Sequence, residues 1–437
     1  MDYNEFLHTK VEVAPVSGFE VRPEDIHPAL KPHQRDAVMW AVKGGRRALF
    51  ESFGLGKTVQ ELEWCRLVQE HEQAPVIIVL PLGVRQEFTR DAVQLLGMEP
   101  PQYVRTMEEV RANPAKIYMT NYERVRDGDI DPRLFAGAAL DEASVLRSYG
   151  SKTFQEFMRL FKGVKYKLVA TATPSPNRYK ELIHYAGYLE VMDTGQALTR
   201  FFQRDSTKAN NLTLYPHKEE EFWLWVSSWA LFLSSPADLG YDATGYDLPP
   251  LDVRIHKITT RIGDVVDKDG QVKLMRDAAV SLQDAAKEKN ESVVARVAKA
   301  KEIVDSDPGA HFLLWHDLEY ERHEILRQIP GTVDIHGSMD SDARERRAID
   351  SSEGHTRPIA KQKSLSGSGC NFQRYCHRAI FVGIDYEFND FIQAIHRIYR
   401  FLQGEQVIID VIFTEAEEHI WRVLLEKWEN HNKLQEN

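Results

Sequence analysis

A glycine-rich loop that ends in a lysine and a threonine is the part of this sequence with the clearest chemistry. It spans Glu51–Thr58 and reads Glu-Ser-Phe-Gly-Leu-Gly-Lys-Thr, directly before a helical pattern. Gly54 and Gly56 let backbone amides face phosphate oxygens, and the helix start adds its positive dipole end. Lys57 would reach the β- and γ-phosphates, and the Thr58 hydroxyl would bind Mg²⁺. The loop therefore predicts a site for ATP and Mg²⁺, with a chance turn before a helix as the alternative.

Two adjacent carboxylates downstream supply groups that hydrolysis needs. Asp141 and Glu142 follow the short run 136–140, which reads Ala-Gly-Ala-Ala-Leu and predicts a strand. In phosphoryl transfer to water, one carboxylate holds Mg²⁺ and another orients the attacking water. We assign Asp141 to the metal and Glu142 to the water. A solvated acidic loop is the alternative, but the position downstream of a phosphate loop favours catalysis.

Three residues near the C-terminal end could grip the γ-phosphate from a second lobe. Gln393, Arg397 and Arg400 are spaced by four and three residues, so a helix over 390–401 would carry them on one face. Two guanidiniums side by side suit the charge that develops on the γ-phosphate. A solvated basic helix face would be the first interpretation of this spacing alone. Its pairing with a phosphate loop far upstream favours a catalytic role.

Alternating strands and helices are predicted on both sides of a middle segment. Before residue 200, helical patterns alternate with strand-like runs at 76–80, 117–120, 136–140 and 167–171. After residue 291 the alternation resumes, with strands expected at 311–316, 379–383 and 406–413. This order predicts parallel sheets covered by helices, with ligands at the carboxyl ends of the strands. The predicted fold class is α/β, with an N-terminal ATP-binding lobe over 1–200 and a C-terminal lobe over 291–437.

The middle segment, residues 201–290, has a different composition. It is rich in aromatic residues and turn clusters and lacks the regular strand–helix alternation. We expect it to form a helical protrusion and linker between the lobes. Phe222, Trp225 and Trp229 stand at near-helical spacing, which favours a buried core over stacking on nucleic-acid bases.

The composition is that of an ordinary globular protein, with 43% hydrophobic and 28% charged residues among 437. The net charge of −11 means that a nucleic-acid track would have to be held by a local strip of donors. Three cysteines without CxxC spacing argue against disulfides and structural zinc. No signal peptide or membrane-crossing apolar run is visible. We therefore expect a cytoplasmic protein without a membrane partner.

The segment after the last predicted strand of the first lobe carries a family resemblance. Residues 168–177 read Leu-Val-Ala-Thr-Ala-Thr-Pro-Ser-Pro-Asn. This resembles the Ser-Ala-Thr coupling motif of helicase superfamily 2, in the form found in Swi/Snf-type DNA translocases. Similar segments occur in phage-encoded helicases, which implies a phage or prophage origin and a bacterial or phage-infected host cell. The resemblance also implies two RecA-like lobes that close around ATP and Mg²⁺.

The resemblance continues in order from Leu30 to Gln403. Residues 30–34 resemble an adenine-reading motif, which implies that Gln34 hydrogen-bonds the base and that Phe19 stacks on it. Further matching segments are 79–82, 120–123, 312–316, 336–339, 366–371 and 393–400. Glu51 replaces a glycine of the general phosphate-loop pattern, at a position that motors of this superfamily commonly relax. The chain departs from the family where Asp-Glu-Ala-Ser lacks the commoner histidine, and at His396.

Side chains in or beside the strand-contacting motifs are the candidates for gripping nucleic acid. In the resembling family, phosphate contacts come largely from backbone amides and hydroxyls, which an acidic protein can also provide. The candidate side chains are Arg85, Asn121, Arg147, Lys363 and Asn371. An exposed, solvated residue is the alternative at each position.

Together these motifs imply an ATP-dependent translocase or helicase that couples hydrolysis between two lobes to movement along DNA. Duplex DNA is the favoured track, with single-stranded DNA as an alternative. A second hypothesis is a nucleotide-gated clamp that recruits a nuclease, repair or replication partner. A third is an RNA helicase. The presence of Glu142, Arg397 and Arg400 favours turnover over binding alone.

Overall fold

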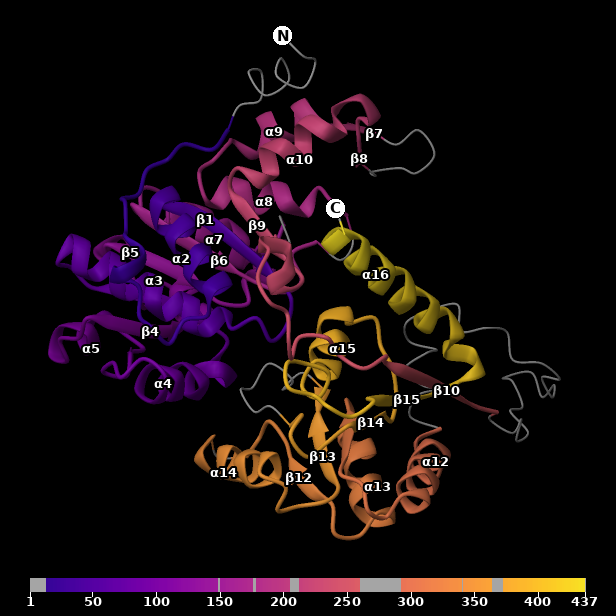
Figure 1. Cartoon of the computed structure of the whole chain (residues 1–437). Helices are drawn as coiled ribbons and strands as arrows, with labels where there is room; N and C mark the ends of the chain where they lie inside the picture. Colours follow the sequence, from indigo (N-terminus) through magenta and orange to yellow (C-terminus); the bar gives the residue numbers. More distant parts are fainter. Residues whose placement is uncertain are drawn as a thin grey trace. The chain divides into compact units, whose positions relative to one another are not determined.

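The computed structural model describes residues 13–147, 150–175, 178–204, 212–259, 292–339, 341–363 and 372–436. The chain divides into two compact units, Met1–Ala243 with Asn430–Asn437, and Thr244–Glu429. Each unit contains one large sheet in which every strand pair is parallel, and Figure 1 labels its elements.

Within the described residues, the first unit has a seven-stranded parallel sheet in the order β3-β4-β2-β5-β6-β1-β9. The bounds are β1 Arg46–Glu51, β2 Val76–Leu80, β3 Gln102–Tyr103, β4 Ile117–Asn121, β5 Gly137–Leu140, β6 Tyr166–Ala170 and β9 Ala230–Leu233. A strand buried on both faces reads as a continuous apolar run, as β2 does with Val-Ile-Ile-Val-Leu. Because β5, β6 and β1 are neighbours, their carboxyl ends meet at one edge of the sheet.

Helices flank this sheet (Figure 1). The α-helices are α2 Pro32–Gly44, α3 Lys57–Glu72, α4 Arg85–Gln94, α5 Met107–Ala112, α6 Tyr122–Arg126, α7 Lys152–Leu160, α8 Glu181–Tyr188, α9 Thr194–Phe201 and α10 Glu219–Ser227. The 3-10 helices are η1 Pro23–Asp25, η2 Leu82–Val84, η3 Pro132–Leu134, η4 Ala143–Arg147, η5 Pro216–Lys218 and η6 Pro236–Leu239.

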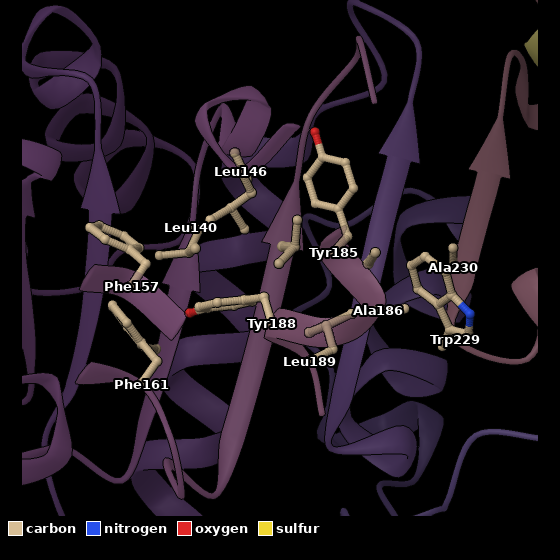
Figure 2. Close-up of a cluster of buried hydrophobic side chains, with 14 of the residues drawn as sticks. Leu140, Leu146, Phe157, Phe161, Tyr185, Ala186, Tyr188, Leu189, Trp229 and Ala230 are labelled. Carbon is tan, nitrogen blue, oxygen red and sulfur yellow. The ribbon is translucent and has the colours of Figure 1, made fainter. Parts of the chain in front are cut away.

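Alternate strand residues feed two separate apolar cores. Leu49 of β1 and Ala139 of β5 belong to the core that includes α2 and α3. Phe50 and Leu140, the next residue on each strand, belong to the core that includes α7 and α8. Successive side chains of a strand point to opposite faces, so the two cores lie on the two faces of the sheet. Figure 2 shows part of the second core, in which the α8 residue Tyr188 packs near Leu140.

The aromatic-rich segment lies in the core of the first unit. Phe222, Trp225 and Trp229 are each at most 1% exposed. The rings of Trp225 and Trp229 meet edge to face with centroids 5.5 Å apart. The preference for burial over base stacking is therefore confirmed at these positions. Figure 2 shows Trp229 directly before β9.

The described strands within 201–290 are divided between the two units, and the expected helical protrusion stays a prediction. β7 (Phe202–Arg204) and β8 (Leu212–Leu214) pair antiparallel in the first unit, where β9 joins the edge of the large sheet beside β1. β10 (Asp252–Ile258) pairs with β15 of the second unit, and residues 260–291 lie outside the described part. The units therefore divide at Ala243 and Thr244 rather than near the expected 200 and 290. Backbone hydrogen bonding explains this, because β9 and β10 each satisfy an open sheet edge.

In its described residues, the second unit has a six-stranded parallel sheet in the order β10-β15-β14-β11-β13-β12. The further strands are β11 Phe312–His316, β12 Val333–Ile335, β13 Ile359–Gln362, β14 Arg378–Phe381 and β15 Ile408–Thr414. The helices are α12 Val293–Ser306, α13 Glu319–Gln328, α14 Ser341–Ser352, α15 Phe388–Ile395, η8 Glu415–Glu417 and α16 Glu418–Glu436, of which α16 belongs to the second unit only up to Glu429. The sequence did not predict β10, β12 and β13, of which the last two are short and carry few apolar residues.

The predicted fold class is confirmed. Both units are parallel α/β sheets flanked by helices, as expected of two RecA-like lobes. Among the described residues, no helix combines the length and apolar content that crossing a bilayer requires.

Candidate active site

The phosphate loop, the acidic pair and the segment that begins at Thr171 converge at one edge of the first sheet. The loop follows β1, Asp141 follows β5, and Thr171 follows β6, and these three strands are neighbours. The Asp141 amide donates to the Val79 carbonyl at 2.9 Å, and the Thr171 amide donates to the Leu49 carbonyl at 3.2 Å. Each segment is therefore held in register by the neighbouring strand as it leaves the sheet. Ligand sites of parallel α/β sheets form at this kind of edge.

The phosphate loop has the backbone conformation that its glycines predict. Gly54 has φ +88° and Gly56 has φ +87°, both in the left-handed region that disfavours other residues. Gly56 is the N-cap of α3, so Lys57 and Thr58 are the first two residues of this helix. The Lys57 ammonium donates to the carbonyls of Glu51 at 2.8 Å and Ser52 at 3.1 Å. This lysine therefore points back into the loop, where a phosphate would lie.

Gln34 connects the first helix of the unit to the phosphate loop. Its side-chain oxygen accepts the Lys31 amide at 2.9 Å, which caps α2, and its Nε2 donates to the Leu55 carbonyl at 2.8 Å. A Cβ on Gly56 would lie 2.3 Å from this Nε2. The side chain thus lies directly against the loop. The expected contact with adenine stays a prediction, and the Phe19 ring is stacked on His71, with centroids 3.8 Å apart.

The acidic pair lies in an environment that suits a divalent cation. Burial and the neighbouring charge of Glu142 raise the pKa of Asp141. Burial and Asp141 likewise raise the pKa of Glu61, a fully buried carboxyl on α3. Burial lowers the pKa of Lys57, although nearby carboxylates oppose this effect. Carboxyl groups with raised pKa values gain most from a bound cation. Together with the Thr58 hydroxyl, these carboxyl groups offer the oxygen ligands that Mg²⁺ prefers.

Glu142 is fixed by its backbone and by the next strand. Its φ is +48°, which a non-glycine residue adopts only at some cost. Its Oε1 accepts the Thr171 hydroxyl at 3.0 Å, and the same hydroxyl accepts the Thr173 amide at 3.1 Å. The acidic pair and the segment that follows β6 are thus joined by a side-chain hydrogen bond. The sequence identified both segments but not this contact.

Arg147 forms a second connection between the residues that follow the acidic pair and the segment that follows β6. Its guanidinium donates to the carbonyls of Ser144 at 3.0 Å and Thr173 at 3.1 Å. Its own carbonyl lies 2.7 Å from Nδ1 of His184 on α8. Arg147 therefore links η4 to the segment that follows β6, and its expected contact with nucleic acid stays a prediction.

Two of the nucleic-acid candidates lie together. The Arg85 guanidinium, at the first residue of α4, lies over the ring of Tyr103 at 5.0 Å from its centroid. The Tyr103 hydroxyl donates to Oδ1 of Asn121, the last residue of β4, at 3.1 Å. We call Arg85, Tyr103 and Asn121 the Tyr103 cluster. It combines a cation, a half-buried aromatic ring and an amide near the carboxyl ends of β2 and β4.

The candidates of the second unit have different surroundings. Lys363 is 2% exposed, and its ammonium lies 3.0 Å from Asp317 and 2.9 Å from Asp385. Asn371 lies outside the described residues. The expected strand contact is therefore untested at Asn371, whereas the Lys363 ammonium already has two carboxylate partners.

The helix expected over 390–401 is shorter than predicted. α15 ends at Ile395, so Gln393 is helical while Arg397 and Arg400 follow the helix in a turn. The prediction that all three share one helix face is wrong. Backbone carbonyls after Ile395 find partners outside the helix, which removes the need for further helical hydrogen bonds. The Arg397 carbonyl accepts the Phe372 amide at 3.0 Å, and the carbonyl of Ile398 accepts the Gln403 side chain at 3.0 Å.

No protein-family model matches this chain. Over 210 residues it is 27% identical to the chromodomain-helicase-DNA-binding protein 3 homolog of Caenorhabditis elegans. The chain is similar to part of a helicase. The matched region is 39% of this chain and 12% of that relative's length.

A solved structure is also similar. It is the Sulfolobus solfataricus SWI2/SNF2 ATPase core in complex with dsDNA, with a TM-score of 0.43 and 16% sequence identity. The alignment covers 96% of each chain.

Gln60 and Glu61 were not singled out by sequence, and Glu51 was noted only because it replaces a glycine of the phosphate-loop pattern. Glu51, at the end of β1, is fully buried, and its carboxylate accepts Nε2 of Gln60 at 2.7 Å. Burial raises the pKa of Glu51 to about 7. Glu61 stands four residues after Lys57, a spacing that places both on one side of α3. That spacing was the available signal for Glu61, whereas only the fold shows that Glu51 is enclosed.

Proposed function

We propose that this chain is an ATPase that uses hydrolysis to move along DNA, with duplex DNA as the favoured track. One observation carries the proposal: the phosphate loop, the acidic pair and the Thr171 segment follow three neighbouring strands and are joined by the Thr171–Glu142 hydrogen bond. A plain nucleotide-binding loop does not need this connection. A motor does, because the state of the nucleotide has to reach the segment beyond β6.

The residues of the first unit have distinct proposed roles. Lys57 binds the β- and γ-phosphates once its ammonium leaves the loop carbonyls, and Gln34 reads the base. Thr58 and Asp141 would hold Mg²⁺, which would supply charge neutralisation at the phosphates. Glu142, held by Thr171, orients the attacking water and accepts its proton.

In the second unit, Gln393, Arg397 and Arg400 are the proposed contacts to the γ-phosphate. Guanidiniums from another lobe would link nucleotide state to lobe closure. This assignment rests on the family resemblance. The same resemblance supports a phage or prophage origin and a cytoplasmic location in the host cell.

The Tyr103 cluster is the proposed contact of the first unit with the nucleic-acid backbone, together with Arg147. A phosphate could bind the Arg85 guanidinium and the Asn121 amide. The similarity to a relative that is named as a DNA-binding helicase supports DNA over RNA. Asn371 is the proposed contact of the second unit.

Steady-state ATP hydrolysis with Mg²⁺ tests the proposal. The rate is measured alone and then with duplex DNA, single-stranded DNA or RNA, and Lys57→Ala serves as the blank. We expect duplex DNA to stimulate hydrolysis most and Lys57→Ala to show no activity. If RNA stimulates hydrolysis more than DNA does, RNA replaces DNA as the nucleic acid along which the motor moves. No response to any nucleic acid would reject the motor, whereas slow hydrolysis without movement along DNA would favour the nucleotide-gated clamp.

A further inference from the structure

A buried ion cluster joins three strand ends in the second unit. Lys363 follows the last residue of β13, and Asp317 follows the last residue of β11. Asp385 lies four residues beyond the end of β14. β13, β11 and β14 are neighbours, and the Lys363 ammonium lies 3.0 Å from Asp317 and 2.9 Å from Asp385. One cation therefore connects three loops at the carboxyl edge of this sheet.

The ammonium of this cluster is committed to its two carboxylates. Lys363 is 2% exposed, so a phosphate outside the protein could reach its charge only by displacing a carboxylate. Burial by itself would lower the pKa of Lys363, but Asp317 and Asp385 outweigh burial and raise it. The lysine therefore stays charged inside the fold. A buried charge with two hydrogen-bonded partners is expensive to disturb.

Asp385 connects the Lys363 ammonium to the start of α15. One carboxylate oxygen binds Lys363, and the other accepts the amide of Glu387 at 2.9 Å. Glu387 is the N-cap residue of α15. The start of the helix that carries Gln393 and leads to Arg397 is thus tied to the Lys363 ammonium through the Asp385 carboxylate.

The Asp317 side of the cluster is fixed as well. Glu321 Oε2 accepts the amides of Asp317 at 2.8 Å and Leu318 at 3.0 Å. Its Oε1 accepts Arg296 at 2.6 Å, and both side chains of this pair are fully buried. Arg296 also donates to the Val382 carbonyl, directly after β14. The two carboxylates that hold Lys363 therefore stand on loops with little freedom to move.

We propose that Lys363 is a positioning residue that fixes the start of α15, and with it the proposed γ-phosphate contacts Gln393, Arg397 and Arg400. This role rests on the proposed ATPase function, and it replaces the direct contact with nucleic acid that the sequence suggested for this lysine. A rigid support of this kind matters because a misplacement of about 1 Å can cost roughly a hundredfold in rate.

The kinetic test uses the full chain and three variants. Lys363→Met removes the charge and keeps the stem, Lys363→Arg keeps the charge, and Lys301→Met removes an exposed lysine of α12 that pairs with Asp305. We expect Lys363→Met to lower kcat at saturating ATP and duplex DNA by about ten- to a hundredfold. The duplex concentration for half-maximal stimulation and its salt dependence should stay unchanged. Lys363→Arg should recover part of the rate, and Lys301→Met should match the unmodified protein.

The opposite pattern would overturn the proposal. A lysine that binds phosphate would keep kcat at saturating duplex, raise the half-maximal concentration and reduce the salt slope by about one. If Lys363→Met does not fold, Asp385→Asn serves instead, because it keeps an oxygen for the Glu387 amide and loses the charge that binds Lys363. It should also lower kcat at an unchanged half-maximal duplex concentration.

A second readout separates this proposal from the proposed function. Hydrogen exchange is measured at the amides of 388–395 without nucleotide or DNA. We expect faster exchange in Lys363→Met than in the unmodified protein, and no change in Lys301→Met. Unchanged protection of these amides in Lys363→Met would reject the positioning role even if the ATPase activity were confirmed. Faster exchange in a chain without DNA-stimulated hydrolysis would reject only the motor.

Discussion

The hydroxyl of Thr171 donates to Oε1 of Glu142 at 3.0 Å, which connects the ends of β6 and β5. Glu142 holds this position with φ at +48°, in the left-handed region. A glutamate in such a conformation needs surroundings that enforce it, and such positions are found at functional sites. The bond therefore links the proposed water-orienting carboxylate to the segment that the sequence assigned to coupling.

Removal of this bond should slow hydrolysis without abolishing nucleotide binding. Thr171→Val keeps the side-chain volume and loses the hydroxyl, whereas Thr171→Ser keeps the donor. A single hydrogen bond contributes about 0.5–1.5 kcal/mol, so we expect kcat to fall roughly two- to tenfold in Thr171→Val. The KM for ATP should change little, and Thr171→Ser should stay near the original rate. Steady-state hydrolysis measures both, and equal rates for the two variants would contradict a role for the hydroxyl.

Gly56 should tolerate alanine less well than a glycine of equal φ elsewhere. Gly56→Ala adds a Cβ 2.3 Å from Nε2 of Gln34, at φ +87°. Gly128→Ala is the matched control, with φ +86° and nothing within 4 Å of the added Cβ. Both variants bear the left-handed strain, but only Gly56→Ala displaces the two hydrogen bonds of Gln34. We expect its ATP affinity to fall at least roughly tenfold in a binding titration. Equal affinities in the two variants would show that Gln34 does not support the loop.

The buried carboxyl of Glu51 should make stability depend on pH. Burial raises its pKa from 4.5 to about 7 in the folded protein. Between these values the unfolded chain releases a proton that the folded chain keeps, so the free energy of unfolding falls as the pH rises. At about 1.4 kcal/mol per unit, the loss is complete above pH 7 and reaches roughly 3 kcal/mol.

Glu51→Gln should remove this dependence, because the amide can still accept the Gln60 side chain and has no proton to lose. We expect the variant to match the original protein near pH 4 and to be more stable at pH 8. Urea unfolding without nucleotide, monitored by tryptophan fluorescence at pH 4 and pH 8, measures the difference in the free energy of unfolding. If Glu51→Gln is less stable than the original protein at pH 8, the ionised carboxylate of Glu51 does not destabilise the fold, which would contradict the raised pKa.

The pair Arg296 and Glu321 should be a point of high sensitivity in the second unit. Both side chains are fully buried, so Arg296→Met would leave the Glu321 charge without its cation. Loss of one partner of a buried ion pair costs about 3–5 kcal/mol. On the same helix, the exposed pair of Lys301 and Asp305 should contribute at most about 1 kcal/mol. Thermal unfolding of Arg296→Met and Lys301→Met compares the two pairs. A small loss of stability in both variants would show that the ion pair between Arg296 and Glu321 does not stabilise the second unit.

Local sequence was enough to predict several parts of the site. The Gly-x-Gly-Lys-Thr spacing implies a left-handed loop before a helix, because glycines allow positive φ and a helix start offers free amides; Gly54 and Gly56 have this conformation. Apolar runs such as 76–80 and 167–171 fall on β2 and β6. The parallel α/β class follows from their alternation with helices. Tryptophans at helical spacing were assigned to a core, and Trp225 and Trp229 are buried.

Other features needed the folded chain, because they depend on which strands become neighbours. Sequence spacing cannot show that β5 and β6 are adjacent, so the contact of Thr171 with Glu142 was not visible. The same limit applies to Lys363, whose partners Asp317 and Asp385 are 46 and 22 residues away in sequence. The end of α15 at Ile395 also depends on partners elsewhere, since Phe372 and Gln403 satisfy the carbonyls that follow.

The sequence by itself determined the chemical groups of this protein and the local conformations that present them, because backbone preferences and apolar periodicity act over a few residues. The tertiary structure decided the partners of each charged group and the order of strands in each sheet. Burial and strand adjacency are properties of the whole fold. They decide that Lys363 is enclosed between two carboxylates and that β9 and β10 complete different sheets.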